Sequence, residues 1–467
     1  MRSANHFPEF EAKMRAASLS EPTIRAFARS YETLMDERTS LNRIRESRIE
    51  PVADLPRLET ITAGAGEPSL LAQTVVLKLN GGLGTSMGLE GPKSLVRVKD
   101  ELTFLDITAR QILHLRRKHG VSLRLLLMNS PITSQQTLEF LRRHAGLGDP
   151  KDLELMQSTV PKVDALTYRP VEWPQDPQLE WCPPGHGDIY PSLVGSGWLD
   201  RLLHEGVRYM FVSNSDNLGA TLDVALLGSF AASGRPFLME VAERTASDRK
   251  GGHLARAEGK LILRERAQCP DFDLAAFEDI QRHRFFNTNN LWIRLDELDK
   301  LLRKYDGFLP LPVIRNEKTV DPRIKTSPKV FQLETAMGAA IECFENAGAI
   351  VVPRNRFAPV KTTSDLLVLR SDACVLTDDW QMVLAPSRQG RPPSVDLDGD
   401  DYRLIDQLDE KLREGIPSLV GCQALTVCGP VSFDRGVSFR GKVKIVNRSK
   451  EARRLTAGTY TDCELEL

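Results

Sequence analysis

The sequence of 467 residues lacks the marks of several common classes of protein. Its formal net charge is −1 at pH 7, so no overall basic field favours nucleic acid as a partner. Its seven scattered cysteines include no C-x-x-C pair, and their odd number suits reduced thiols better than a disulfide framework. No hydrophobic run approaches a membrane span, and residues 1–8 contain no apolar core of a signal peptide. We therefore expect a soluble cytoplasmic protein.

Two common nucleotide-binding motifs are also missing, although a glycine-rich segment is present at residues 78–94. Lys93 follows Pro92 rather than glycine, so the Walker A pattern fails. Met87 occupies a position where the dinucleotide fingerprint requires glycine. The strand predicted at 123–128 is followed by Asn-Ser rather than by the acidic residue that would bind a ribose. Residues 78–94 are therefore predicted to be a nucleotide-binding loop of another type.

The glycine-rich segment has the composition of a loop that binds an anion. Before it, the β-branched and apolar run Thr74–Leu77 predicts a buried parallel strand. Glycines at 81, 82, 84, 88 and 91 let backbone N–H groups approach a ligand closely, and Lys93 adds a full positive charge. The alternative interpretation is an ordinary glycine-rich turn after a strand.

Predicted strands alternate with predicted helices from Leu71 onwards. The pattern predicts a helix over Leu102–His119 and strands over Leu123–Met128, Arg208–Val212 and Phe237–Val241. Such alternation favours a mixed or parallel sheet covered by helices, with ligands at the carboxyl ends of the strands.

Residues 1–70 are predicted to be a helical segment packed on the main domain. The reason is that apolar residues of one helix face recur between charged residues, at Ile24, Phe27, Tyr31, Leu34 and Met35.

A six-residue repeat near the C-terminus predicts a second domain. Leu425, Val431, Val437 and Val443 are six residues apart, and so are Val427, Phe433, Phe439 and Ile445. Each unit places two apolar residues on one side of a very short strand, and glycines at 429, 436 and 441 permit tight corners. This period is typical of a parallel β-helix; the alternative is two ordinary hairpins. Ala385–Pro393, followed by Asp396–Asp401, is predicted to be a linker to this domain because of its proline, glycine and charged residues.

Seven blocks of the sequence together form a recognisable pattern. They are Leu79–Gly88 with Gly91–Ser94, Pro183–Tyr190, Ser213–Thr221, Lys250–Gly252, Phe286–Trp292, Gln332–Thr335 and Val360–Asp365. In this order they resemble the eukaryotic-type UTP–glucose-1-phosphate uridylyltransferase (UDP-glucose pyrophosphorylase) family, and seven blocks in the family's order are far more specific than any one of them. The resemblance implies an α/β fold: a Rossmann-like, GT-A-like nucleotidyltransferase with a mixed sheet and a C-terminal parallel β-helix. It divides the chain into a helical segment at 1–70, a catalytic domain at 71–385 and a β-helix domain at 386–467.

The family's reaction joins UTP and glucose 1-phosphate to give UDP-glucose and pyrophosphate, with Mg²⁺ as cofactor. The attacking phosphate oxygen is already an anion at neutral pH, so catalysis reduces to alignment and neutralisation of charge. The resemblance implies that Lys93 and Lys361 act as catalytic cations on the UTP phosphates and that Asp216 holds the metal. Lys361 precedes a run of helix-capping residues, so we expect it just before a helix start, where phosphate is favoured. An Asx-turn cap is the alternative role for Asp216.

The resemblance also assigns the remaining ligand contacts. For UTP they are Leu79, Asn80, Gly81, Gly82, Gln157, Gly185 and Asn214. For glucose 1-phosphate they are His186, Asn214 and Asn289. The block around Gln157 is the weakest match, because Lys162 stands where the family has arginine. The roles of Lys162 and Glu240 stay open.

Other functions of the same pocket are possible from the sequence alone. The sugar could be another sugar 1-phosphate, or the protein could be a non-catalytic sensor of nucleotide sugars. The presence of Lys93, Asp216 and Lys361 together counts against a sensor. An exposed end of the β-helix could pair with a second subunit, so a homo-oligomer through the C-terminal domain is possible.

Overall fold

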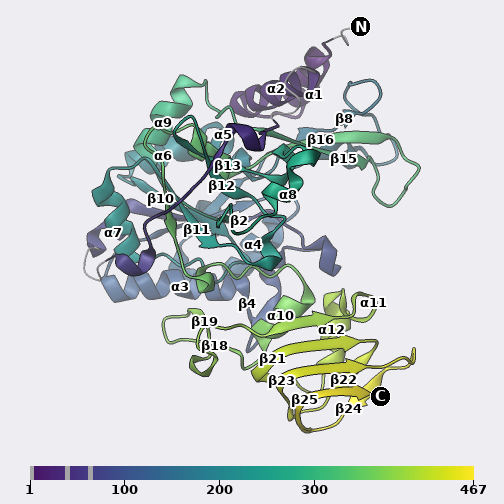
Figure 1. Cartoon of the computed structure of the whole chain (residues 1–467). Helices are drawn as coiled ribbons and strands as arrows, with labels where there is room; N and C mark the ends of the chain where they lie inside the picture. The colour runs from purple at the N-terminus through teal and green to yellow at the C-terminus, as the bar shows by residue number, and fades with distance from the viewer. Residues whose placement is uncertain (1–4, 37–42, 62–66) are drawn as a thin grey trace.

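The main body of the protein is a large mixed sheet surrounded by helices (Figure 1). The structure, a computed structural model, describes residues 5–36, 43–61 and 67–467. Within these residues ten strands form the sheet, whose central order is β1-β12-β14-β10-β2-β5-β6, with β13 beside β12 and with β11 and β17 continuing from β14. β10, β2, β5 and β6 run parallel, whereas β14 is antiparallel to β10. The ten strands are β1 (Glu50–Pro51), β2 (Thr74–Asn80), β5 (Arg124–Asn129), β6 (Glu154–Met156), β10 (Tyr209–Asn214), β11 (Phe237–Glu243), β12 (His253–Ala257), β13 (Lys260–Arg264), β14 (Phe285–Arg294) and β17 (Gly348–Val351).

Each face of this sheet packs against its own set of helices. Val75 and Leu77 of β2 belong to the core formed with α5, α6 and α9, whereas Val76, which points the other way, packs with α3, α4 and α7. Both faces are apolar, as the continuous apolar run of β2 predicts. The helices are α3 (Phe104–His119), α4 (Ser134–Leu141), α5 (Ile189–Gly195), α6 (Trp198–His204), α7 (Val224–Ser233), α8 (Leu274–Phe277) and α9 (Leu295–Lys304). The four predicted strands and the predicted helix are confirmed, with ends that differ by at most three residues.

Among the described residues of the predicted N-terminal helical segment, α-helices lie only in the first half. Helices α1 (Phe7–Ala16) and α2 (Glu21–Met35) pack against a smaller sheet region, and the predicted apolar face of α2 is buried from Ile24 to Leu34, with Met35 partly buried. From residue 43 the chain forms short turns, and β1 joins the main sheet beside β12. The smaller region contains β7 (Val160–Pro161), β8 (Val163–Asp164), β9 (Trp181–Cys182), β15 (Val313–Thr319) and β16 (Lys329–Thr335).

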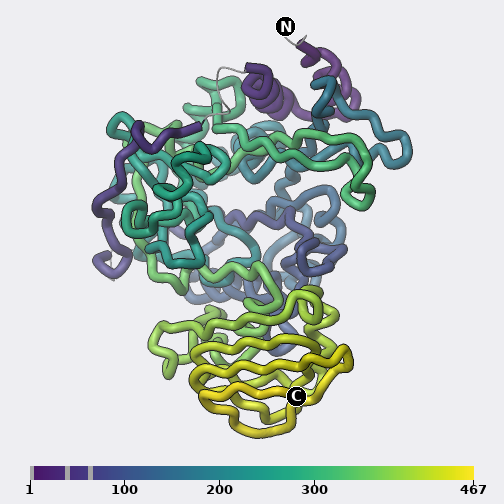
Figure 2. The backbone as a smooth tube through the Cα atoms, turned by 45° about the vertical axis from the view of Figure 1, so that its right-hand side comes forward, coloured from purple at the N-terminus to yellow at the C-terminus, as the bar shows by residue number. Residues whose placement is uncertain are grey.

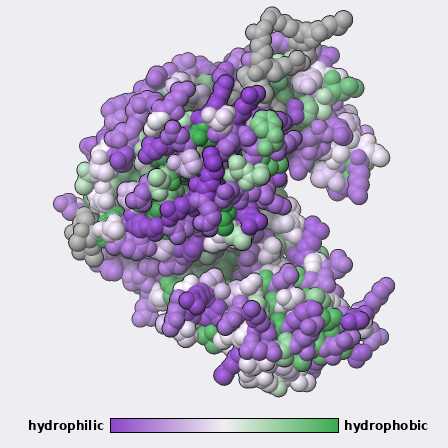
Figure 3. Space-filling model, in the orientation of Figure 1, coloured by the Kyte–Doolittle hydropathy of each residue, from purple (hydrophilic) through white to green (hydrophobic). Residues whose placement is uncertain are grey.

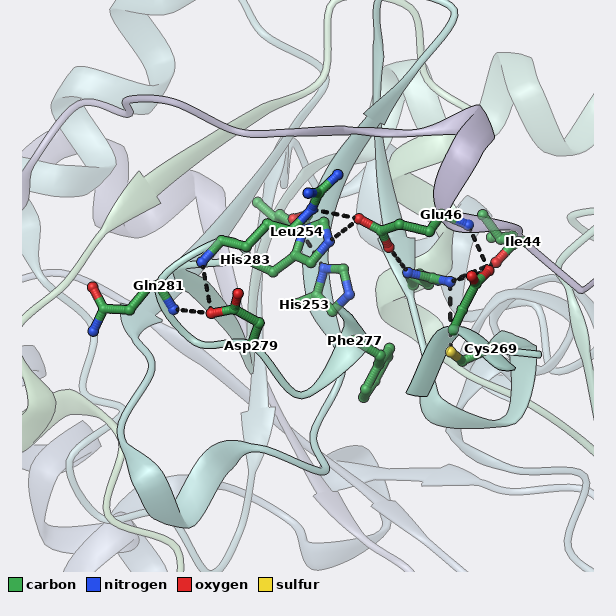
Figure 4. A network of polar contacts seen from close by, with 12 residues as sticks. Ile44, Glu46, His253, Leu254, Cys269, Phe277, Asp279, Gln281 and His283 are labelled. Atoms are coloured by element: carbon green, nitrogen blue, oxygen red, sulfur yellow. Dashed lines mark hydrogen bonds and ion pairs between the residues drawn. The ribbon is translucent and has the colours of Figure 1, made fainter. Parts of the chain in front are cut away.

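Glu46 anchors this part of the chain to the main body (Figure 4). Its carboxylate accepts hydrogen bonds from Arg282 Nε at 2.7 Å and His283 Nε2 at 2.9 Å, and it pairs with the fully buried Arg264. Burial alone raises the pKa of Glu46, but the hydrogen bonds from His283 and Arg264 outweigh it, so the pKa lies below its usual value. These contacts tie the segment, which contains a 3-10 turn at Glu46–Arg48, to the main body.

The C-terminal repeat forms a coiled arrangement of parallel strands, and the hairpin alternative is wrong. β20, β21, β23 and β25 pair in parallel in one sheet, and β22 pairs in parallel with β24 in another. Leu425 lies beside Val443 and Val427 beside Ile445, and the eight apolar residues of the repeat are buried. Figure 2 shows the strands stacked as successive coils. They are β20 (Ser394–Leu397), β21 (Ser418–Cys428), β22 (Val431–Phe433), β23 (Val437–Val446), β24 (Arg453–Leu455) and β25 (Gly458–Glu466).

The hydrophobic core of the C-terminal unit begins before the predicted boundary at residue 386. Val360 and α10 (Thr363–Arg370) already belong to it, together with Met87 of the glycine-rich loop. The expected linker is not a free connection, because Arg388 donates hydrogen bonds to carbonyl groups of β21. Figure 3 shows a hollow between this unit and the main body. The remaining elements of this unit are β18 (Cys374–Leu376), β19 (Met382–Leu384), α11 (Gly399–Tyr402) and α12 (Ile405–Lys411). The main body also contains a hairpin of β3 (Arg97–Lys99) and β4 (Leu102–Thr103).

In the described ranges, every helix is either too short or too polar to span a lipid bilayer. All seven cysteines are free thiols, as their scattered positions predict.

Candidate active site

A cavity of about 620 Å³ lies where β2, β5 and β10 end. These strands are parallel neighbours, so their carboxyl ends meet at one edge of the sheet. The volume lies in the usual range for small-molecule sites. Nine residues predicted from the sequence line the cavity: Leu79, Gly81, Gly82, Lys93, Gln157, Gly185, His186, Asn214 and Asp216.

The glycine-rich loop folds back on itself beside the cavity. Gly84 and Gly88 have φ of +63° and +77°, a conformation that favours glycine. The Lys93 N–H donates to the Gly82 carbonyl at 3.2 Å, so the end of the loop returns to its beginning. A Cβ on Gly81 would lie 2.6 Å from Gln157 Oε1, so a larger residue at this position would displace the Gln157 side chain.

Lys93 joins three segments that are far apart in the sequence. Its ammonium donates to Asp216 Oδ2 at 2.7 Å and also to the Val360 carbonyl. Both side chains of the ion pair are largely buried, with 16% and 17% of their surfaces exposed. The glycine-rich loop, the loop after β10 and the residue before Lys361 therefore converge on one point.

Lys361 follows Val360 directly, but it is not among the residues that line the cavity. It is exposed and directly precedes Thr362, the N-cap of α10. Thr362 and Asp365 form a capping box, so the predicted position just before a helix start is confirmed. Its side chain makes no ion pair with any residue in the described ranges.

Asp216 supplies the only carboxylate among the described residues that line the cavity. It follows β10, where the Ser215 N–H donates to the Leu79 carbonyl at 3.0 Å and fixes the loop against β2. The described residues contain no group of three or more side chains able to cage a metal. A lone carboxylate fits a cation such as Mg²⁺, which takes one or two carboxylates and completes its shell with phosphate oxygens and water.

Gln157 and Gly185 also line the cavity. Gln157 Nε2 donates to the Gly185 carbonyl at 3.0 Å, so the amide is oriented by the backbone. Gly185 has φ of +80°, and a Cβ there would lie 2.4 Å from the Thr335 carbonyl oxygen. Only glycine can therefore carry the chain through this point.

His186 is a neutral hydrogen-bond donor. Its Nδ1 accepts from the Met337 N–H at 3.0 Å, which leaves the proton of the neutral ring on Nε2. Burial lowers the pKa of His186 to about 4. Near pH 7 the ring therefore brings an N–H group, but no charge, to the cavity.

Comparison with known proteins identifies the family. A profile described as UTP–glucose-1-phosphate uridylyltransferase matches residues 24–440. The chain belongs to this family. The enzyme of that name from Solanum tuberosum is 42% identical over 383 residues, which cover 81% of this chain and 78% of that protein. The one from Saccharomyces cerevisiae is 40% identical over 84% of this chain and 78% of its own length.

Solved structures of the family superpose on almost the whole chain. A single-residue variant of UDP-glucose pyrophosphorylase from Leishmania major, in complex with UDP-glucose, is 47% identical, with a TM-score of 0.93 over 99% of this chain and 100% of that one. A Trypanosoma brucei structure titled UDP-glucose phosphorylase is 48% identical, with a TM-score of 0.90 over 99% and 100% of the two chains. These likenesses confirm the α/β nucleotidyltransferase fold.

Two further residues that the family resemblance assigns to ligands do not line the cavity. The Asn80 side chain is buried and donates to Asn129 Oδ1 at 2.7 Å and to Thr137 Oγ1 at 3.0 Å. Asn80 can therefore offer a ligand its backbone, while its amide ties β2 to β5. Asn289 lies on β14 with φ of +59°, and its Oδ1 accepts from Asn287 Nδ2 at 2.9 Å.

The two residues left open are structural. Lys162 is buried, and its ammonium donates to the Val320 carbonyl at 3.0 Å. Glu240 is fully buried and pairs with Arg356. Neither lines the cavity.

Sequence reasoning missed part of the cavity wall. The segment from Met128 to Ile132, except Asn129, contributes four lining residues, and Ser158 and Thr159 contribute two more. The predicted end of the strand at residue 128 could have indicated these residues, because it lies at the same sheet edge as the loops after β2 and β10.

Proposed function

We propose that the protein transfers the uridylyl group of UTP to glucose 1-phosphate, with release of pyrophosphate. Membership of the family names this reaction. The observation in this molecule that carries it is the convergence of Lys93, Asp216 and Val360, which precedes Lys361, beside a cavity of ligand size. Polyanionic substrates need such local cations, because the whole chain has almost no net charge.

The reaction is a displacement at the α-phosphorus of UTP. A phosphate oxygen of glucose 1-phosphate forms the new bond to that phosphorus as the bond to the bridging oxygen of pyrophosphate breaks. The attacking oxygen is already deprotonated, so no residue has to act as a general base. The neutral His186 is consistent with this, because its Nε2 carries a proton. We propose that Lys93 and Lys361 neutralise the negative charge of the triphosphate and of the departing pyrophosphate.

Asp216 is the residue that we propose holds Mg²⁺. When bound there, the ion supplies charge neutralisation to the UTP phosphates. Lys93 already balances the charge of this carboxylate and orients it through the 2.7 Å contact. Asn214, at the end of β10, lies within the same wall and is proposed to bind sugar or ribose hydroxyl groups.

The two sides of the cavity are proposed to bind different parts of the substrates. Gln157 carries both donors and an acceptor for the imide edge of uracil, and Gly185 presents its backbone beside it. Backbone groups of Leu79, Asn80, Gly81 and Gly82 would contact UTP from the sheet edge. His186 is assigned to the phosphate of glucose 1-phosphate. Asn289 is assigned to a glucose hydroxyl, although its amide is held by Asn287 in this state.

A pyrophosphate-release assay tests this function. Purified protein is incubated with UTP, Mg²⁺ and a panel of sugar 1-phosphates that includes glucose, galactose and N-acetylglucosamine. We expect release with glucose 1-phosphate above all, and loss of release when Mg²⁺ is chelated. Pyrophosphate release with a different sugar 1-phosphate instead would show that this compound, rather than glucose 1-phosphate, is the substrate. Tight binding of UDP-glucose without release with any sugar would establish the sensor function in place of the enzyme.

We further propose a cytoplasmic location and association of subunits through the C-terminal unit. Seven free thiols suit a reducing compartment. β25 lies at the edge of its sheet, where unpaired backbone groups can bind another strand. Cell fractionation tests the first point, and light scattering on size-exclusion peaks tests the second.

A further inference from the structure

A buried pair, Glu240 and Arg356, lies behind the active site without lining its cavity. Arg356 donates from Nε to Glu240 Oε2 at 2.9 Å and from Nη2 to Oε1 at 2.7 Å. Trp292 Nε1 and Asn290 Nδ2 also donate to this carboxylate, at 2.9 and 3.0 Å. Since Glu240 is 0% exposed and has four hydrogen bonds, it is fully engaged within the protein.

Arg356 also connects two loops of the site. Its Nη2 donates to the Thr221 carbonyl at 2.9 Å, and its own carbonyl accepts from Asn217 Nδ2 at 3.0 Å. Asn217 Oδ1 in turn accepts from the Ala358 N–H at 3.1 Å. A Cβ on Gly219 would lie 2.0 Å from the Asn355 carbonyl oxygen, so the two loops are in close contact.

These contacts join the loop that carries Asp216 to the loop that leads to Lys361. Asn217 is the neighbour of Asp216, and Ala358 lies three residues before Lys361. A buried ion pair adds little stability compared with well-packed apolar residues, so stability alone does not account for it. What the structure shows is that Arg356 connects the two loops.

We propose that Asn217, held by the Glu240–Arg356 pair, is a positioning residue that sets the place of Lys361 relative to Asp216. This inference rests on the proposed function, which assigns those two residues to the phosphates. A displacement of a catalytic group by about 1 Å can lower turnover about a hundredfold, so a modest loosening of the loops should be visible in kcat.

The test is Asn217→Ala with Asn447→Ala as a matched control. Asn447 is a buried amide of the C-terminal unit that also bridges two carbonyl groups, at 2.8 Å each, and accepts one N–H. Both variants should lose similar thermal stability. Only Asn217→Ala should lower kcat, by about tenfold or more, with both KM values within about threefold. Hydrogen exchange of residues 357–362 should rise in Asn217→Ala and not in the control.

A second pair of measurements shows whether Asn217 acts through Lys361. In a Lys361→Ala background, adding Asn217→Ala should lower kcat by a further factor of less than about two, because the effects of substitutions at residues that act as a unit are not additive. Arg356→Lys, which keeps the charge but loses the fork, should show the same kcat loss and replaces Asn217→Ala if that variant does not fold. Unchanged kcat in these variants, or a full additional loss in the Lys361→Ala background, overturns the inference. Absence of pyrophosphate release by the wild-type protein refutes the proposed function instead.

Discussion

Replacement of Lys361 by alanine should separate catalysis from stability. The side chain is exposed, and the contact of this residue with α10 is made by its backbone N–H, which donates to Asp365 Oδ2 at 2.8 Å and is kept in the variant. Exposed substitutions of this kind change the free energy of unfolding by less than about 0.5 kcal/mol. Loss of a cation that stabilises the transition state costs about 3 kcal/mol, or roughly a hundredfold in kcat.

The assay is pyrophosphate release at saturating UTP and glucose 1-phosphate, together with thermal unfolding. Lys450→Ala, which removes another exposed ammonium far along the chain in the C-terminal unit, is the control and should keep wild-type turnover. Lys361→Arg restores charge without the geometry of an ammonium and should recover only part of the rate. Turnover of Lys361→Ala close to wild type would refute the role assigned to this lysine. A large fall in its melting temperature would refute the reasoning from exposure.

Three further predictions concern glycines of the site and the anchor of the N-terminal segment. Gly185→Ala should destabilise the protein by about 2 kcal/mol or more in urea unfolding, because φ is +80° and the Cβ would meet the Thr335 carbonyl; wild-type stability would contradict the assigned backbone. Gly81→Ala should raise the KM for UTP with little change in stability, because the Cβ would displace Gln157; an unchanged KM would exclude that amide from uracil binding. Glu46→Gln should cost about 3 kcal/mol at pH 7, because it removes a charge partner of the fully buried Arg264. Because the wild-type pKa of Glu46 lies below its usual 4.5, this stability difference should persist above that pH and vanish as the pH falls through the lower, folded-state pKa; a difference that grows at low pH would be evidence against the ion pairs.

Much of the site could be predicted from strand ends. The apolar run before Lys78 and the one before Asn214 mark parallel strands, and their carboxyl ends meet because β2 and β10 are neighbours. Glycines of the recognised blocks marked positions with a special backbone: Gly84 and Gly88 have positive φ, and Gly185 passes close to the Thr335 carbonyl. In the C-terminal unit the six-residue period predicted the parallel coils, because each apolar pair must face the same interior.

The remaining features depend on contacts that no local pattern contains. Asn80 ends an apolar strand beside the cavity, yet its amide turns to Asn129, because β5 brings a second polar side chain to the same level. Lys162 stands where the family has arginine, and its burial against the Val320 carbonyl could not be inferred from that substitution. Glu46 is held by Arg264, Arg282 and His283, which lie far along the chain, so no pattern around Glu46 contains these contacts.

The two lysines of the site differ in a way that assigns them different roles. Lys93 is largely buried and is already bound to Asp216 and to the Val360 carbonyl before any substrate arrives. It must share these contacts with the triphosphate, so much of its effect is present in the ground state as well. The Lys361 ammonium is exposed and has no ion-pair partner among the described residues, so no protein contact is lost when charge develops on the leaving pyrophosphate. Only interactions that strengthen in the transition state accelerate the chemical step. Lys361 is therefore the lysine whose removal should lower kcat rather than raise KM, whereas removal of Lys93 should change both and weaken the orientation of Asp216.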